Sequence, residues 1–333
     1  MDPVALTRAL VDIDSTTGRE GQAGRWLAEH LRSLGLSVRT QPVDEGRFNI
    51  LATVGSPQIV FSTHYDCVPP FFPSRIEGDR LYGRGSCDAK GILAAQVAAV
   101  ERLRGDGETR VGLLFVVGEE RGSDGAKLAN TIAVGCRFLV DGEPTESRLG
   151  LATRGMLRLK FKATGRAAHS AYPELGQSAI DTLLDVLVDL RSVDLPSDPV
   201  LGRTHYTIGL IGGGVAPNVV SPSAEAEVMF RTVSDGAEIR RAVKPLESRV
   251  TIEHVLEAPP VRLSTVPGYE AVVFPYTTDI PFLSGWGQPL LFGPGSIHVA
   301  HTADEFISIP ELESAVGHYT TIARHLLARR PGT

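Results

Sequence analysis

Apolar runs of strand length, each followed directly by a histidine or an acid, constrain the fold of this chain most strongly. The runs are residues 58–63, 111–118 and 136–140. Helical segments separate them, including the alanine-rich residues 89–103. Continuous apolar strands joined by helices are typical of a mainly parallel sheet with helices on both faces. The sequence therefore predicts an α/β domain.

A different pattern begins after residue 153. Residues 155–163 alternate apolar and polar side chains, as a half-exposed strand does, and further strand and helix segments follow. Two helices against a four-stranded antiparallel sheet would form an inserted α+β domain. From about residue 265 a helix–strand–helix pattern returns. We therefore expect a catalytic domain of residues 1–153 and 262–333, interrupted by an α+β domain of residues 154–261.

Potential metal ligands fall where such a fold places its active sites. The side chains at or just beyond predicted strand ends are His64, Glu119, Glu120 and Glu143, and Asp88 begins a helix after a glycine-rich turn. Sites in open α/β sheets form at the carboxyl ends of the strands. We therefore expect these side chains to converge at one edge of the sheet.

Two short patterns within this set have chemical meaning. His64 and Asp66 face the same side of an extended segment, so Asp66 can accept a hydrogen bond from the imidazole N–H that faces away from a metal. Glu119 and Glu120 are two adjacent anions, which are costly to bury without compensating charge. A solvated loop would also explain this pair. With metals present, one carboxylate can be a ligand while the other acts as general base.

Composition excludes several other functions. The formal net charge of −6 offers no basic face for nucleic acid. No apolar run approaches the roughly 20 residues that cross a bilayer, and the N-terminus lacks the pattern of a signal peptide. Cys67, Cys87 and Cys136 form a sparse, odd set that suits a reducing compartment, so we expect a cytoplasmic protein without membrane or nucleic-acid partners.

Five segments, in order and spacing, resemble the zinc aminoacylase/carboxypeptidase family. They are HYDCVPP from His64, LYGRGSCDAKG from Leu81, GEERGSDGA from Gly118, DGEPT from Asp141 and GPGSIHVAHTADEF from Gly293. That family includes acetylornithine deacetylase, succinyl-diaminopimelate desuccinylase, acetyl-lysine deacetylase and glutamate-releasing carboxypeptidases. The last segment is most similar to the acetylornithine deacetylase group.

The resemblance implies two divalent cations, with Zn²⁺ expected and Co²⁺ as the alternative. Their ligands would be His64, Asp88, Glu120, Glu143 and His301, with Asp88 shared between both ions and one histidine on each. Glu119 would be the general base and Asp66 would support His64. By position alone Asp141 rivals Glu143 as a ligand, and the GEPT motif favours Glu143.

The inserted domain resembles the lid and dimerisation domain of this family. In residues 165–180, His169 would reach the active site of the partner subunit of a homodimer and stabilise the oxyanion. Asn218 and Arg231 would contact substrate, and an arginine suits a substrate carboxylate because its planar fork donates two parallel hydrogen bonds. By the same resemblance, Thr277, Thr278 and Asp279 would line the substrate pocket.

These features predict a hydrolase that removes an acetyl or succinyl group from an N-acylated amino acid, a small-molecule substrate. The alternatives are a dipeptidase or carboxypeptidase of the same family, and a relative that binds metal or ligand without catalysis. Neither a ligand nor the base is missing from the motifs, which disfavours the last alternative. The sequence leaves open the acyl group, the amino acid, the native metal, and the roles of His298, Cys67 and Cys87.

Overall fold

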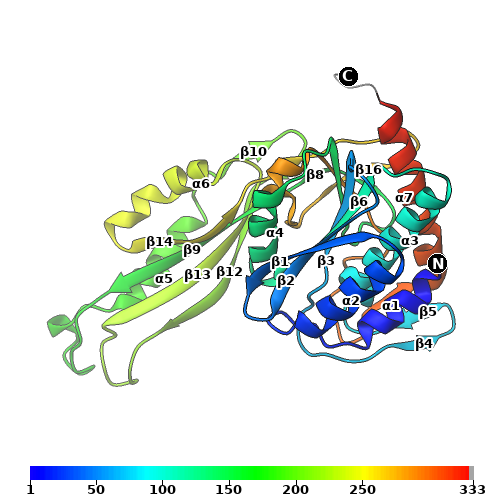
Figure 1. The fold of residues 1–333 in the computed structure, drawn as a ribbon. Helices are drawn as coiled ribbons and strands as arrows, with labels where there is room; N and C mark the ends of the chain where they lie inside the picture. The colour runs from blue at the N-terminus through cyan, green and yellow to red at the C-terminus, as the bar shows by residue number, and fades with distance from the viewer. Residues whose placement is uncertain (330–333) are drawn as a thin grey trace. The chain divides into compact units, whose positions relative to one another are not determined.

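The computed structural model of the chain describes residues 1–329, which divide into two compact units (Figure 1). Unit 1 comprises residues 1–151, residues 262–272 and the described residues from 278 onward. Unit 2 comprises residues 152–261 and residues 273–277. None of the helices in the described part of the chain combines the length and the apolar character needed to cross a membrane.

A six-stranded sheet in the order β1–β2–β6–β3–β7–β17 forms the centre of unit 1. Its strands are β1 (Ser37–Asp44), β2 (Arg47–Thr53), β3 (Ile59–His64), β6 (Val111–Val116), β7 (Phe138–Asp141) and β17 (Gln288–Leu291). The last four strands pair in parallel, which confirms the expected mainly parallel sheet. The β1–β2 hairpin is antiparallel and extends the sheet beyond β6. It was not predicted, because β1 has the largely exposed side chains of an edge strand.

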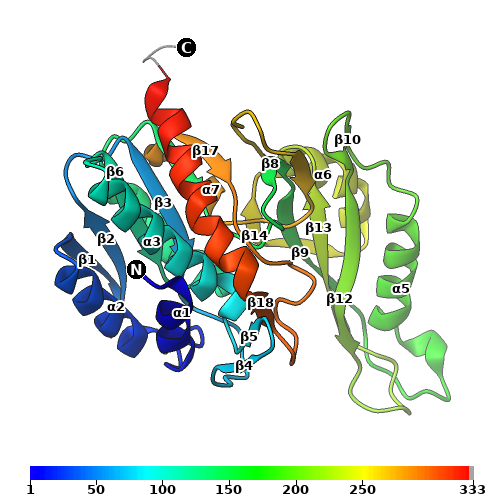
Figure 2. The ribbon, with the colours of Figure 1, turned by 90° about the vertical axis from the view of Figure 1, so that its right-hand side faces the viewer.

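Helices cover both faces of this sheet. They are α1 (Pro3–Val11), α2 (Gly21–Ser33), α3 (Gly91–Gly105), α4 (Asp124–Ala129) and α7 (Ile309–Ala328). Alternate side chains of each strand point to opposite faces. Phe61 therefore packs into the core with α3 and α7, which lie side by side (Figure 2), whereas Val60 packs with Trp286 and α4. With both faces buried, polar side chains of the central strands can reach solvent only near the strand ends.

Unit 2 contains a four-stranded antiparallel sheet in the order β12–β13–β9–β14. Its strands are β9 (Gly155–Thr164), β12 (His205–Gly213), β13 (Ser223–Thr232) and β14 (Thr251–Ala258), and its helices are α5 (Ala179–Leu190) and α6 (Gly236–Val243). Leu157, Leu159 and Phe161 alternate along β9 into a core shared with both helices. The expected α+β arrangement is therefore confirmed.

The remaining strands are short. They are β4 (Arg75–Glu77), β5 (Arg80–Tyr82), β8 (Leu149–Thr153), β10 (Ser197–Asp198), β11 (Gly202–Arg203), β15 (Val261–Arg262), β16 (Ala271–Phe274) and β18 (Phe306–Ser308). The first helix expected after residue 265 is not present. The chain instead forms strand β16 and two 3₁₀ turns, Ile280–Phe282 and Ser284–Trp286, because Pro281, Gly285 and Gly287 interrupt a longer helix.

Candidate metal centre

The carboxyl edge of the sheet in unit 1 holds the candidate ligands. His64 is the last residue of β3, and Glu143 lies two residues beyond β7. Glu120 lies in a 3₁₀ turn, Glu119–Arg121, shortly after β6. Asp88 lies in the turn Ser86–Lys90 directly before α3, and His301 lies in the loop before β18. Parallel pairing of β6, β3 and β7 explains why these strand ends meet.

These five side chains form two groups that share Asp88. His64, Asp88 and Glu143 offer ligand atoms that all lie within 4.8 Å of one another, and Asp88, Glu120 and His301 do the same. Nε2 of His64 lies 3.0 Å from Oδ1 of Asp88, whereas Nε2 of His301 lies 3.3 Å from Oδ2. The two oxygens of Asp88 thus face different histidines, which is the arrangement that a carboxylate bridging two cations requires.

The two groups differ in their access to solvent. His64, Asp88 and Glu143 are all buried, whereas the side chain of His301 is 49% exposed. Nε2 of His301 also lies 3.0 Å from Oε1 of Glu120. One group is therefore interior, and the other opens toward solvent.

This site contains more carboxylates than histidines. Burial raises the pKa of Glu143 well above its usual value, and Asp88 adds to the shift. Asp88 keeps a lowered pKa in spite of its burial, because His301 and His64 hydrogen bond to it. In turn Asp88 and Glu120 raise the pKa of His301 to about 10. Imidazole nitrogens and carboxylate oxygens are ligands of Zn²⁺ and similar cations, whose charge would stabilise these buried acids, so the residues fit a pair of such ions.

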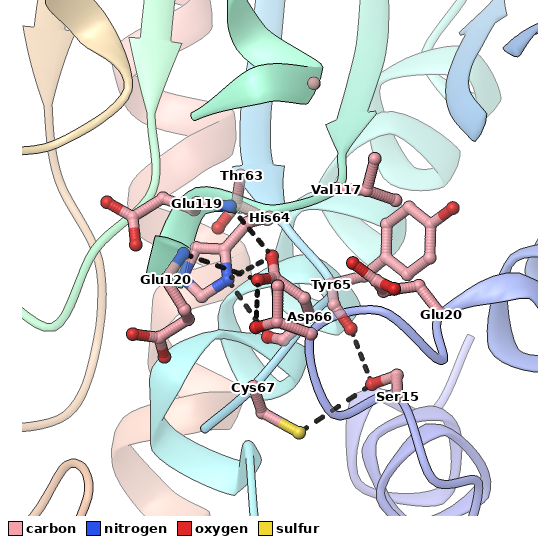
Figure 3. Close-up of polar contacts among 12 residues, drawn as sticks. Ser15, Glu20, Thr63, His64, Tyr65, Asp66, Cys67, Val117, Glu119 and Glu120 are labelled. Carbon is pink, nitrogen blue, oxygen red and sulfur yellow. Dashed lines mark hydrogen bonds and ion pairs between the residues drawn. The ribbon is translucent and has the colours of Figure 1, made fainter. Parts of the chain in front are cut away.

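Asp66 is fully buried and holds several parts of the centre together (Figure 3). Nδ1 of His64 lies 3.1 Å from the carbonyl oxygen of Asp66 and 3.4 Å from its Oδ1. The backbone N–H groups of Glu119 and Glu120 donate to its carboxylate over 3.2 and 3.3 Å, and the hydroxyl of Thr17 donates over 2.8 Å. Asp66 thus contacts His64 and also the turn that carries both glutamates.

Glu119 belongs to neither ligand group among the described residues. Figure 3 shows its carboxylate and that of Glu120 directed to different places. Burial raises the pKa of Glu119 well above its usual value, and the nearby carboxylates of Asp279 and Glu120 add to this effect. A carboxylate that binds a proton readily and is not itself a ligand is suited to act as a base.

The structure also places the weaker candidates. Asp141 accepts a hydrogen bond from the hydroxyl of Ser62, and within the described residues it joins neither ligand group. His298 is exposed and likewise joins neither group of that part of the chain. Cys67 and Cys87 are buried free thiols.

Most of the residues expected to contact substrate lie in unit 2. His169 and Asn218 are exposed and neighbouring, because Ser170 N–H donates to the carbonyl of Asn218 over 2.9 Å. Arg231 on β13 donates to the hydroxyl of Thr277 over 3.5 Å. Thr278 belongs to unit 1, where it is buried and its hydroxyl accepts from the N–H of Ile280.

Two further buried acids lie near the centre: Asp279, which the resemblance assigned only to the substrate pocket, and Glu305, which was not identified as functional from the sequence. Burial raises the pKa of Asp279 to about 7, and Asp141 adds to the shift. Glu305 is fully buried and pairs with Arg84 at 2.6 Å. Glu305 lies in the same motif as His301, but its sequence neighbours do not reveal its contacts, because those partners come from a distant loop.

The chain is similar to known proteins over nearly its whole length. A family model described as Peptidase family M20/M25/M40 matches residues 60–325. A Peptidase M20 domain-containing protein of Schizosaccharomyces pombe is 39% identical over 338 residues, which are 97% of this chain and 84% of the relative. A probable carboxypeptidase of Aspergillus terreus is 39% identical over 367 residues, which are 95% of this chain and 84% of the relative. Among solved structures, a tripeptidase of Staphylococcus aureus has a TM-score of 0.82 at 21% identity, covering 97% of this chain and 98% of that one.

Proposed function

The chain belongs to peptidase family M20/M25/M40 and is a metal-dependent hydrolase, and within that class we propose that it cleaves the amide bond preceding a C-terminal amino acid. The group on the other side of that bond is either a short peptide, as in a carboxypeptidase, or an acyl group, as in an N-acyl amino acid deacylase. The names of the relatives favour the peptide. The acetyl or succinyl group remains the second candidate, because the loop around His301 resembles that of the deacetylases.

The shared carboxylate of Asp88 is the observation that carries this proposal. His64 and Glu143 would hold one divalent cation with Asp88, and Glu120 and His301 would hold the other. We propose Zn²⁺ in both sites, with Co²⁺ as an alternative that the same nitrogen and oxygen ligands accept. Such a pair, when bound, would lower the pKa of a water molecule and polarise the carbonyl of the substrate amide.

Glu119 is the proposed general base. It would take a proton from the attacking water and then deliver that proton to the leaving amine. The bond from its backbone N–H to Asp66 fixes its position relative to His64. Burial raises its pKa well above the usual value, so it accepts a proton from water more readily than an ordinary glutamate does.

His169 is the proposed donor to the oxyanion that develops on the substrate carbonyl. Its Nδ1 accepts from the N–H of Ala171 over 3.1 Å. A neutral His169 therefore carries its proton on Nε2, which can donate to a developing negative charge. The side chain is exposed in unit 2, consistent with a proposed role in the active site of a partner subunit.

Arg231 and Asn218 are the proposed substrate-binding residues. Burial lowers the pKa of Arg231, and in the described residues the only hydrogen bond of its guanidinium is the long one to Thr277. A half-buried cation with most of its donors free favours binding of an anion. The free carboxylate of a C-terminal or N-acylated amino acid would supply that anion.

A homodimer through unit 2 would bring His169 to a second active site. Exposed apolar side chains repeat at helical spacing along α5, at Ile180, Leu184 and Val188, which are 36%, 47% and 58% exposed. The adjacent strand β12 is an edge strand with exposed Leu210 and Ile211. Unpaired strand edges and apolar stripes favour association with another chain.

A substrate screen tests this function. Protein reconstituted with Zn²⁺ or Co²⁺ should hydrolyse short peptides with a free C-terminus and should fail on the same peptides as C-terminal amides. N-acetyl-ornithine, N-acetyl-citrulline, N-acetyl-lysine and N-succinyl-diaminopimelate, assayed in parallel, decide between peptide and acyl specificity. Two bound metal ions without turnover of either substrate class would contradict the proposal and favour a binding protein.

A further inference from the structure

A buried ion pair supports the turn that carries Asp88. Glu305 accepts hydrogen bonds at Oε1 from the backbone N–H groups of Cys87 and Asp88, each over 3.1 Å. Its other oxygen, Oε2, accepts from Nη1 of Arg84 over 2.6 Å, and both side chains are 1% exposed. One carboxylate thus connects the backbone of the shared ligand to a buried cation.

Arg84 is itself held in place. Its Nε donates to the carbonyl of Pro70 over 3.2 Å, and its guanidinium lies 4.9 Å from the centre of the Phe72 ring. A buried ion pair contributes little to stability compared with apolar packing, because both charges lose their hydration. Such a pair beside the metal centre can instead serve to orient the groups around it.

The loop before β18 connects Glu305 to the second ligand group. His301 and Glu305 lie four positions apart in that loop, and both contact residue 88, one at its side chain and the other at its backbone. Residues 301–305 therefore contact Asp88 at both its side chain and its backbone.

We propose that Glu305 is a positioning residue, which fixes the carboxylate of Asp88 between the two groups of ligands. This inference rests on the metal pair of the proposed function. Charge-assisted bonds to two successive N–H groups restrain the backbone of Asp88, and its short side chain then has few ways to move. Because Asp88 belongs to both groups, loss of this restraint should weaken both sites together. Loss of a ligand that belongs to one group should weaken that site first.

The test is binding of Co²⁺ to the metal-free full-length chain, followed by visible absorption and calorimetry. Glu305→Gln keeps the length of the side chain but removes its negative charge. The amide can offer Arg84 only a single uncharged oxygen, or an NH₂ group that cannot accept a hydrogen bond. We expect both Co²⁺ dissociation constants to rise by about 10- to 100-fold, the usual effect of losing a group that supports a ligand. The absorption of bound Co²⁺ should change as well, because the geometry at Asp88 changes.

Glu311→Gln is the matched control. Glu311 also accepts a backbone N–H, from Gly295 over 2.9 Å, and a hydroxyl, from Ser147 over 3.1 Å, but neither donor belongs to a ligand residue. The Glu311→Gln variant should bind both ions as the wild type does. Thermal unfolding of each metal-free variant measures stability separately, since a purely structural role would lower the unfolding temperature and leave the Co²⁺ constants of the folded protein unchanged.

If Glu305→Gln does not fold, Arg84→Gln provides the test in its place. It removes the partner of Oε2 and leaves both N–H bonds to Oε1 possible, so the same change with a smaller magnitude is expected. Unchanged Co²⁺ constants in the folded variant, with two ions bound to the wild type, would overturn the inference alone. A wild type that binds no ion pair would overturn the proposed function and this inference together.

Discussion

Nε2 of His301 lies 3.3 Å from Oδ2 of Asp88. The histidine reaches this place with a φ of 66°, a left-handed conformation that is uncommon outside glycine. Strained backbone of this kind persists where the surrounding structure holds it, often at a functional site. His301 belongs to the group of ligands that opens toward solvent, together with Asp88 and Glu120. It is not part of the interior group that contains His64.

His301→Ala should therefore remove one of two bound ions. The interior group keeps all three of its ligands, so we expect the metal content to fall from two ions per chain to one. Metal analysis after dialysis against a fixed low concentration of Zn²⁺ measures this. His298→Ala is the control and should retain both ions, because His298 joins neither group of the described residues. Equal loss in the two variants would contradict the assignment.

Glu119→Gln should keep both metal ions and lose at least about two orders of magnitude in kcat. The amide is close in size to the carboxylate and keeps the backbone bond to Asp66, but it cannot accept the proton of the attacking water. Metal analysis and turnover of the best substrate from the screen measure the two effects. Glu120→Gln provides the contrast, since it should lower metal content as well. Near-wild-type turnover in Glu119→Gln would show that another group is the base.

The convergence of three of these side chains could be expected from the sequence. His64, Glu120 and Glu143 follow buried parallel strands, and the carboxyl ends of such strands meet at one edge. His301 could not be separated from His298 by any local pattern. The fold of the loop separates them, since it turns His301 toward Asp88 and leaves His298 exposed.

The contacts between distant segments could not be foreseen from the sequence. Asp66 was expected to support His64, but its bonds to Glu119 and Glu120 depend on β6 pairing beside β3. The role inferred for Glu305 likewise depends on a loop that brings it to residues 84–88. Such contacts follow from tertiary structure, and a single sequence contains no periodic signal for them.

Metal binding should release protons at neutral pH. The carboxylates of Asp88 and Glu120 raise the pKa of His301 from its ordinary value of 6.5 to about 10, so the metal-free imidazole carries a proton that a cation must displace. Affinity should therefore increase as the pH rises toward 10. Calorimetric titration at pH 7.5 in buffers of different ionisation enthalpy counts the released protons.

The same raised pKa affects the metal-free fold. The raised pKa of His301 contributes stability that is fully present below pH 6.5, the unfolded value, and is lost as the pH rises through about 10.

In the calorimetric count of released protons, His298→Ala is the control and should release as many protons on metal binding as the wild type does. A count of zero at pH 7.5 would mean that His301 is already neutral in the metal-free protein.

Arg231→Lys should lower kcat/KM for substrates with a free carboxylate by about 10- to 100-fold, the effect of losing one charge-assisted pair. A lysine keeps the charge but cannot donate two parallel bonds. Arg158→Lys, on the exposed face of β9 in the same sheet, is the control and should leave kcat/KM unchanged. Equal losses for free peptides and for peptide amides in Arg231→Lys would show that Arg231 does not recognise the carboxylate.

Leu184→Lys should separate the proposed homodimer. Leu184 lies in the middle of the exposed apolar stripe of α5, where a charge would be costly to bury between two subunits but is harmless in a monomer. The stability of unit 2 should change by no more than about 0.5 kcal/mol, as for other surface substitutions. Asp185→Lys introduces the same side chain at the next position, off the stripe, and should leave the dimer intact. Sedimentation gives the oligomeric state and turnover is measured on the same samples, so a monomeric Leu184→Lys with full activity would show that His169 is not needed from a partner subunit.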